Sequence, residues 1–199
     1  MQLTLIEHPA QEIISLKQAK DYLRVEHDFD DALISSLIRS TRELMETMIE
    51  KSILKQTWKC VISRGSMCGF NLNSFDETDR LQCMVTFALP RPPIMKILSV
   101  HVGGKKLEEH QYRLENISGR FYLCMDLAQI SGAKIDDSLE VLYESGMAEN
   151  PEKVPHQLSL ANLMLVANAY QERYSQSHNE LISQGIRQLI NPFRNLRLI

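Results

Sequence analysis

The chain has 199 residues, of which 44% are hydrophobic and 24% are charged, and its formal net charge at pH 7 is -3. This length suits one domain or two small ones, and the composition is that of a soluble globular protein, which excludes an intrinsically disordered chain. The mildly acidic balance excludes a general electrostatic attraction to nucleic acid, so any contact with DNA would be local or weak.

The amino-terminal sequence MQLTLIEHPAQE lacks the basic start and the long apolar stretch of a signal peptide, so we expect synthesis in the cytoplasm. The cysteines have neither C-x-x-C spacing nor paired histidines at zinc-ligand distance. We therefore predict reduced, small buried side chains and no zinc site. The cysteines are Cys60, Cys68, Cys83 and Cys124.

Two helices are predicted near the amino terminus. Ser15 and Gln18 have the spacing of a capping box, and apolar residues then repeat on one helical face to about Arg24. A longer amphipathic helix is predicted from Leu33 to Ile49. Its other face carries charges of both signs, which we expect to be solvated. These charged residues are Arg39, Arg42, Glu43, Glu46 and Glu50.

A histidine and three aspartates precede the longer helix, and they could be drawn as a metal site or a general base. Carboxylates in this position more often accept hydrogen bonds from the free N–H groups of the helix and meet the positive end of its dipole. We therefore predict a capping role. The residues are His27, Asp28, Asp30 and Asp31.

From Ile53 the apolar period changes from about 3.6 to 2, which predicts strands. Gly103-Gly104 before two lysines predicts a hairpin turn. Together the strands indicate a small antiparallel sheet or barrel. They are predicted around residues 54–62, 81–89, 98–102, 111–114, 120–125 and 138–143.

Two connecting segments in this region have unusual composition. Ser63–Arg80 has no sustained period and is predicted to be a long loop, either gripping a partner or inserted without a role. Leu89–Ile94, with three prolines, could be a polyproline ligand, but its position between strands favours a rigid crossing.

The strongest helix pattern is Val154–Tyr174, which is apolar on almost every side. Only a narrow strip through Ser159, Asn162 and Arg173 is polar. Such a helix is expected to be central and packed by several neighbours, and its polar interruptions argue against a membrane span.

A final short helix is predicted from Leu181 to Ile190, and Asn191-Pro192 ends it. The carboxy-terminal segment that follows, Phe193–Ile199, carries apolar side chains and two arginines that would be unusual in water. It either docks on a partner or folds back on its own domain, and the sequence leaves both possibilities open.

No sequence-local motif for nucleotide binding, metal-dependent proteolysis or serine hydrolysis occurs, and the histidines are scattered. We therefore predict no catalytic residue, no metal and no cofactor.

Five pieces of the sequence, taken in order, resemble the head-tail connector (adaptor) proteins of tailed phages, prophages and gene transfer agents. They are Ser15–Trp58, LPRPPI at Leu89–Ile94, LEVLYESG at Leu139–Gly146, the helix VPHQLSLANLMLVANAYQERY at Val154–Tyr174, and LINPFR at Leu189–Arg194. The loop at Ser63–Arg80 departs from the pattern because it is longer and more polar than expected.

The resemblance implies an α+β fold, in which helices from both ends of the chain form a bundle and a small antiparallel β-sheet or barrel is inserted between them. The expected division is 1–52 for the N-terminal helical part, 53–150 for the inserted β region, and 151–199 for the C-terminal helices and docking tail. The two helical parts would form one domain because each supplies the apolar face that the other must bury.

The resemblance also implies a structural virion protein and not an enzyme. Its subunits would form a ring, a dodecamer in this family, that binds the portal protein, extends the DNA channel and meets a head-closure or tail-completion protein. Passing DNA would be contacted weakly and without sequence specificity, and no membrane is involved. The protein would be found in the host cytoplasm during assembly and then in the neck of the particle.

The carboxy-terminal segment is the predicted portal-docking site, in keeping with the family's habit of docking through its carboxy end. Apolar anchors and arginines that pair with portal carboxylates would act together there. The candidate residues are Phe193, Arg194, Leu196, Arg197, Leu198 and Ile199.

Two alternatives from other classes remain. One is a small-molecule-binding domain or enzyme with a pocket in the β region. The other is a DNA-binding module in the helical parts, although its candidate recognition helices lack a basic face.

Overall fold

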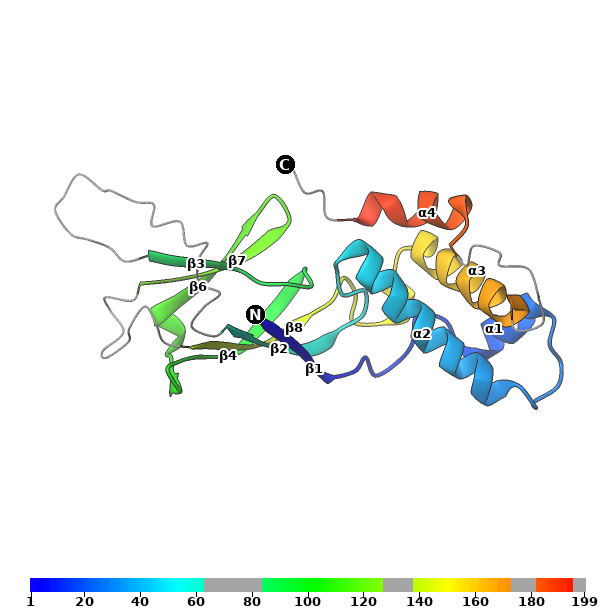
Figure 1. The fold of residues 1–199 in the computed structure, drawn as a ribbon, viewed down its shortest axis with the longest axis horizontal. Helices are drawn as coiled ribbons and strands as arrows, with labels where there is room; N and C mark the ends of the chain where they lie inside the picture. The colour runs from blue at the N-terminus through cyan, green and yellow to red at the C-terminus, as the bar shows by residue number, and fades with distance from the viewer. Residues whose placement is uncertain (63–83, 127–137, 173–181, 195–199) are drawn as a thin grey trace. The chain divides into compact units, whose positions relative to one another are not determined.

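The computed structural model describes residues 1–62, 84–126, 138–172 and 182–194. The chain divides into two compact units (Figure 1). The sheet unit comprises Met1–His8 and Gln56–Gly146, and the helical unit comprises Pro9–Lys55 and Met147–Ile199. The chain therefore passes between the units after His8, after Lys55 and after Gly146.

The helical unit contains four α-helices among its described residues. They are α1 (Leu16–Leu23), α2 (Asp31–Ile49), α3 (His156–Glu172) and α4 (Gln184–Ile190), accompanied by the 3-10 turns η3 (Pro151–Lys153) and η4 (Asn191–Phe193). Helix α3 contacts each of the other three, so its predicted central position is confirmed. The fully buried side chains of this core include Ile34, Met45, Leu158 and Leu165.

The start of α1 shows the predicted capping box. The Gln18 backbone N–H donates to Ser15 Oγ at 3.2 Å, and the Ser15 N–H donates to Gln18 Oε1 at 2.8 Å. These two bonds satisfy backbone donors that the first helical turn leaves free, which fixes where the helix begins.

The described residues of the sheet unit form two antiparallel sheets, with strand orders β1-β2-β8-β4-β5 and β3-β7-β6. Their strands are β1 (Gln2–Glu7), β2 (Gln56–Ile62), β3 (Met84–Ala88), β4 (Ile94–Val102), β5 (Lys105–Lys106), β6 (Tyr112–Ile117), β7 (Arg120–Asp126) and β8 (Leu139–Ser145), with the 3-10 turn η1 (Glu109–Gln111) before β6. Inward-facing side chains of both sheets form one apolar core, which includes Cys60, Val100, Leu123, Val141 and Tyr143. The predicted α+β class, a helical bundle with an antiparallel sheet region, is confirmed.

Two connections of the sheet unit follow the predictions. Gly103 and Gly104 have φ of 58° and 83° in the turn between β4 and β5, a backbone that favours glycine. The segment Leu89–Pro93 joins β3 to β4, which lie in different sheets, so it is a crossing between strands. There the Tyr143 hydroxyl donates to the Pro90 carbonyl at 2.9 Å, which fastens the crossing to β8.

The amino-terminal strand β1 was not predicted. It pairs with β2, where Leu3 lies opposite Cys60 and Leu5 opposite Trp58. Residues 1–8 thus belong to the sheet unit, whereas the expected division places them with the helices. Two alternating leucines are too short a pattern to predict a strand, and the strand β2 that pairs with them lies far along the chain.

Two further predictions concern the cysteines and the loop Ser63–Arg80. Cys60 and Cys124 are free and buried, as predicted, whereas Cys68 and Cys83 lie outside the described residues. The predicted loop Ser63–Arg80 also lies outside them.

Neighbouring residues of α2 offer a direct test of the helical core. Ile34 is 0% exposed and Leu33 is 38% exposed. We expect Ile34→Ala to lower the free energy of unfolding by about 2–5 kcal/mol, because it removes buried surface and leaves a cavity. Leu33→Ala should change it by about 0.5 kcal/mol or less. Denaturant titration of both variants measures this, and equal losses would contradict the described packing.

Candidate functional site

The predicted docking residues begin at the end of α4. Ser183 caps this helix by accepting from the Ile186 N–H at 3.4 Å, and Ile186 and Ile190 are buried in the helical core. Phe193 in η4 is half-buried and packs against the same core, while Arg194 is exposed. The start of the carboxy-terminal segment is therefore fixed to the helical unit.

The remaining docking candidates lie outside the described residues, so their role stays a prediction. They are Leu196, Arg197, Leu198 and Ile199. Of the predicted set, the structure describes Phe193 and Arg194, and Phe193 packs against the core of its own unit.

A groove of about 850 Å³ lies in the helical unit, lined by the start of α1, by α2, and by the start of α3 with the turn before it. Its lining combines apolar and polar residues, among them the carboxylates of Glu12 and Glu152, and contains no lysine or arginine. The apolar lining residues are Ile13, Ile14, Leu16, Ile38, Pro151, Val154 and Leu163. Such a surface suits an apolar segment that carries positive charge.

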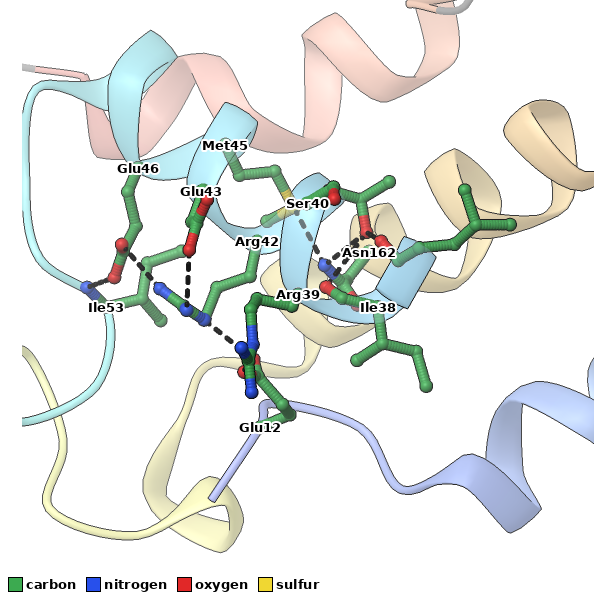
Figure 2. A network of polar contacts seen from close by, with 12 residues as sticks. Glu12, Ile38, Arg39, Ser40, Arg42, Glu43, Met45, Glu46, Ile53 and Asn162 are labelled. Atoms are coloured by element: carbon green, nitrogen blue, oxygen red, sulfur yellow. Dashed lines mark hydrogen bonds and ion pairs between the residues drawn. The ribbon is translucent and has the colours of Figure 1, made fainter. Parts of the chain in front are cut away.

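One wall of the groove is held by a buried arginine (Figure 2). The Arg42 side chain is 0% exposed, and its Nε donates to Glu12 Oε2 at 2.7 Å. Its Nη1 donates to Glu46 Oε2 at 2.8 Å, and Glu43 Oε1 lies 3.5 Å from Nη2. Glu46 Oε1 also accepts from the Ile53 N–H at 2.8 Å. These contacts join α2 to the segments that precede α1 and follow α2.

The environment keeps Arg42 charged. Burial acts to lower the pKa of Arg42, but the hydrogen bond that Arg42 donates to Glu12 and the charges of Glu46, Glu12 and Glu43 outweigh it, so the pKa is raised. A charge buried in this way is tolerated only with such partners, because removing it from water is costly.

The predicted solvated face of α2 is wrong for Arg42 and Glu46. Arg39, Glu43 and Glu50 are exposed as predicted, but Arg42 and Glu46 are buried. The opposite charges at four-residue spacing were a local signal for the Arg42–Glu46 pair. Glu12, thirty positions earlier in the chain, left no local signal.

Asn162 was also wrongly assigned, to a wet strip of α3. It is 0% exposed, and its Nδ2 donates to Thr41 Oγ1 of α2 at 3.2 Å (Figure 2). The polar interruption of an apolar helix here marks a polar contact inside the bundle, since a buried amide needs a partner.

The predicted capping of α2 by acidic side chains is wrong, because the side chain of the N-cap residue Asp30 makes no capping hydrogen bond. Lys20 Nζ lies 2.6 Å from Asp28 Oδ1 and 2.7 Å from Asp31 Oδ1, and the Tyr170 hydroxyl donates to Asp30 Oδ2 at 2.5 Å. The hydrogen bond from Lys20 lowers the pKa of Asp28. These contacts hold a loop whose Phe29 side chain is 95% exposed.

The described residues were also searched for a metal site and for a membrane-spanning helix. Within the described ranges, no group of three or more histidine, cysteine, aspartate or glutamate side chains could hold a metal ion. No helix in this part of the chain is long and apolar enough to cross a membrane. The groove, which sequence reasoning missed, is assembled from three separate segments, so no single stretch of sequence could predict it.

Comparison with known proteins gives consistent results for the whole chain. A family model described as head completion protein matches residues 12–196. The fold is similar to a chain in the virion of a native gene transfer agent particle, with a TM-score of 0.73 and 17% identity. It is also similar to chains in the neck of an empty particle solved with C6 symmetry and in the neck of a native particle solved with C12 symmetry, with TM-scores of 0.73 and 0.71 and 16% identity each. All three likenesses cover 100% of this chain and 98% of the other. A search of curated proteins found no match.

Two arginines of α2 test the buried network. Arg42→Met leaves the buried Glu46 carboxylate without its cation, and we expect the free energy of unfolding to fall by about 3–5 kcal/mol. Arg39, 62% exposed and 3.7 Å from the same Glu12, is the matched control. Arg39→Met should cost about 1 kcal/mol or less. If denaturant unfolding shows similar stabilities for the two variants, Arg42 does not hold the helical unit as described.

Proposed function

The chain belongs to the head completion protein family, and on this premise we propose that it is a subunit of a homo-oligomeric ring that binds below the portal, extends the DNA channel and joins the head to the tail. The family membership confirms the resemblance found in the sequence, and it makes the chain a structural protein of head completion and not an enzyme.

The observation that carries this proposal is the extent of the structural likeness. Both the helical unit and the sheet unit are included, since the likeness to the neck chains covers 100% of this chain and 98% of theirs. A likeness limited to one unit would support only a common ancestry of that unit. A likeness over the whole chain, with a sheet region inserted into a helical bundle, supports a common role. The neck of the native particle was solved with C12 symmetry, which favours a dodecamer.

A ring closed by rotation needs two unlike, complementary faces on each subunit. The loop before α2 offers one candidate contact, because Phe29 is 95% exposed while Lys20 holds the aspartates on either side of it. An exposed aromatic side chain on a held loop loses little freedom on binding, which suits an interface anchor. We place Phe29 at the contact between neighbouring copies.

Docking on the portal is assigned to the carboxy-terminal segment. Phe193 packs on the helical core and so fixes where the segment leaves the unit. Leu196, Leu198 and Ile199 would fill apolar pockets of the portal, with Arg194 and Arg197 pairing to its carboxylates.

A net charge of -3 is compatible with a channel through which DNA passes, because tight binding of the DNA phosphates would slow its release. The proposed place of action is the neck, after assembly in the host cytoplasm.

A charge reversal in this segment tests portal docking. We expect Arg197→Glu to weaken binding to the portal protein of the same genome by about tenfold or more, since an arginine anchor at an interface contributes over 1.4 kcal/mol. Lys17→Glu, the same charge change on an exposed residue of α1, is the matched control and should bind like the unaltered chain. Biolayer interferometry on immobilised portal rings measures both. Equal affinities of the two variants would contradict docking through the carboxy-terminal segment.

A further inference from the structure

One large apolar side chain of α3 stands uncovered beside the groove. Leu160 is 43% exposed. Residues three and four apart adjoin on a helix surface, so Leu160 adjoins His156 and Leu163, which line the groove. On its other side it adjoins Met164, whose Cε would lie 3.8 Å from a β-carbon added at Gly185 of α4. Leu160 therefore lies between α4 and the groove on the surface of α3.

The carboxy-terminal end of α4 lies on the side of the amino-terminal end of α3. Helices α3 and α4 are in contact and run in opposite directions (Figure 1). The turn η4, with Phe193, therefore lies at the end of α3 that begins with His156 and the groove lining. Five residues follow the described Arg194, and an extended chain of that length spans about 17 Å.

The chemistry of these five residues matches that of the groove. Their sequence, NLRLI, has three large apolar side chains, one arginine and no acidic residue. The groove lining contains seven apolar residues, the carboxylates of Glu12 and Glu152, and no lysine or arginine. Glu12 is engaged by Arg42, which leaves Glu152, an exposed residue, as the partner for an incoming cation.

We propose that the groove of the free subunit is the docking site of the chain's own residues 195–199. The segment crosses Leu160, covers its exposed surface and packs its apolar side chains against the apolar lining residues of the groove, and Arg197 pairs with Glu152. The cost of ordering five residues is offset by burial of three apolar side chains and by the charge pair.

A regulatory consequence follows, and it rests on the proposed function. The same segment is proposed to dock on the portal, so groove and portal compete for it. A free subunit then presents its docking segment only in the fraction of molecules in which the segment has left the groove, and the portal selects that fraction. This would delay engagement until intact portal rings are present at sufficient concentration.

Photo-crosslinking of the full-length chain, without any portal present, tests the docking itself. A benzophenone amino acid replaces Leu198, the sample is irradiated, and the crosslinked peptides are identified by mass spectrometry. We expect crosslinks to the groove-lining residues of 11–18 and 150–163. Glu152→Lys should lower their yield about fivefold, and Arg197→Glu added to Glu152→Lys should restore it, because the charge pair is then reversed. Glu149→Lys, an exposed change outside the groove lining, should leave the yield unchanged.

Several results would overturn the inference. Crosslinks spread over other surfaces, or a groove crosslink insensitive to Glu152→Lys, would show that the groove does not hold the segment. Mixing isotopically light and heavy subunits tests whether the segment binds its own chain, because crosslinks within one chain never join a light peptide to a heavy one. Light–heavy crosslinks at the frequency of random pairing between molecules would contradict that assignment. Since the portal is absent, failure of this experiment leaves the ring proposal standing, and failure of portal binding leaves this one standing.

Discussion

The buried guanidinium of Arg42 holds non-helical segments of the helical unit, which the backbone hydrogen bonds within the helices do not hold. Through Glu12 it reaches the segment that arrives from the sheet unit after His8, and through Glu46 it reaches Ile53, just before the chain returns there. The Ile53 carbonyl in turn accepts from the N–H groups of Met147 and Ala148, where the chain comes back at 3.0 and 3.1 Å. Within the helical unit, the chain segments at all three crossings between the units are therefore joined by one network of hydrogen bonds and ion pairs. This is how a bundle built from both ends of the chain can carry an inserted sheet region.

The same network links the core to the surface that a partner can use. Glu12 is both an ion-pair partner of Arg42 and part of the groove lining, so the buried ion-pair network extends to the groove wall. At the other end of the unit, Lys20 holds the loop of Phe29 with two ion pairs. A structural role in head completion needs such held surfaces more than it needs a reactive centre, because specificity of assembly comes from preorganised complementary faces.

Features encoded by neighbouring residues were predicted well, whereas features made by distant residues were not. The capping box of Ser15 and Gln18, the Gly103-Gly104 turn and the apolar α3 each depend on a short stretch, and all three are present. Strand β1 and the burial of Arg42 depend on partners far along the chain, and both were missed. The polar contact of Asn162 could have been anticipated, since an amide in an otherwise apolar helix requires a partner inside the protein. The family was found from the order of five weak motifs, and the groove, which no motif encodes, required the fold.

We propose that copies of this chain form a ring on the portal, and native mass spectrometry of the protein mixed with intact portal rings from the same genome can detect such a complex. The account predicts a discrete complex in which twelve copies sit on one portal ring, the number favoured by the C12 symmetry of the similar native neck. The absence of any complex, under conditions in which the portal ring stays intact, would contradict it.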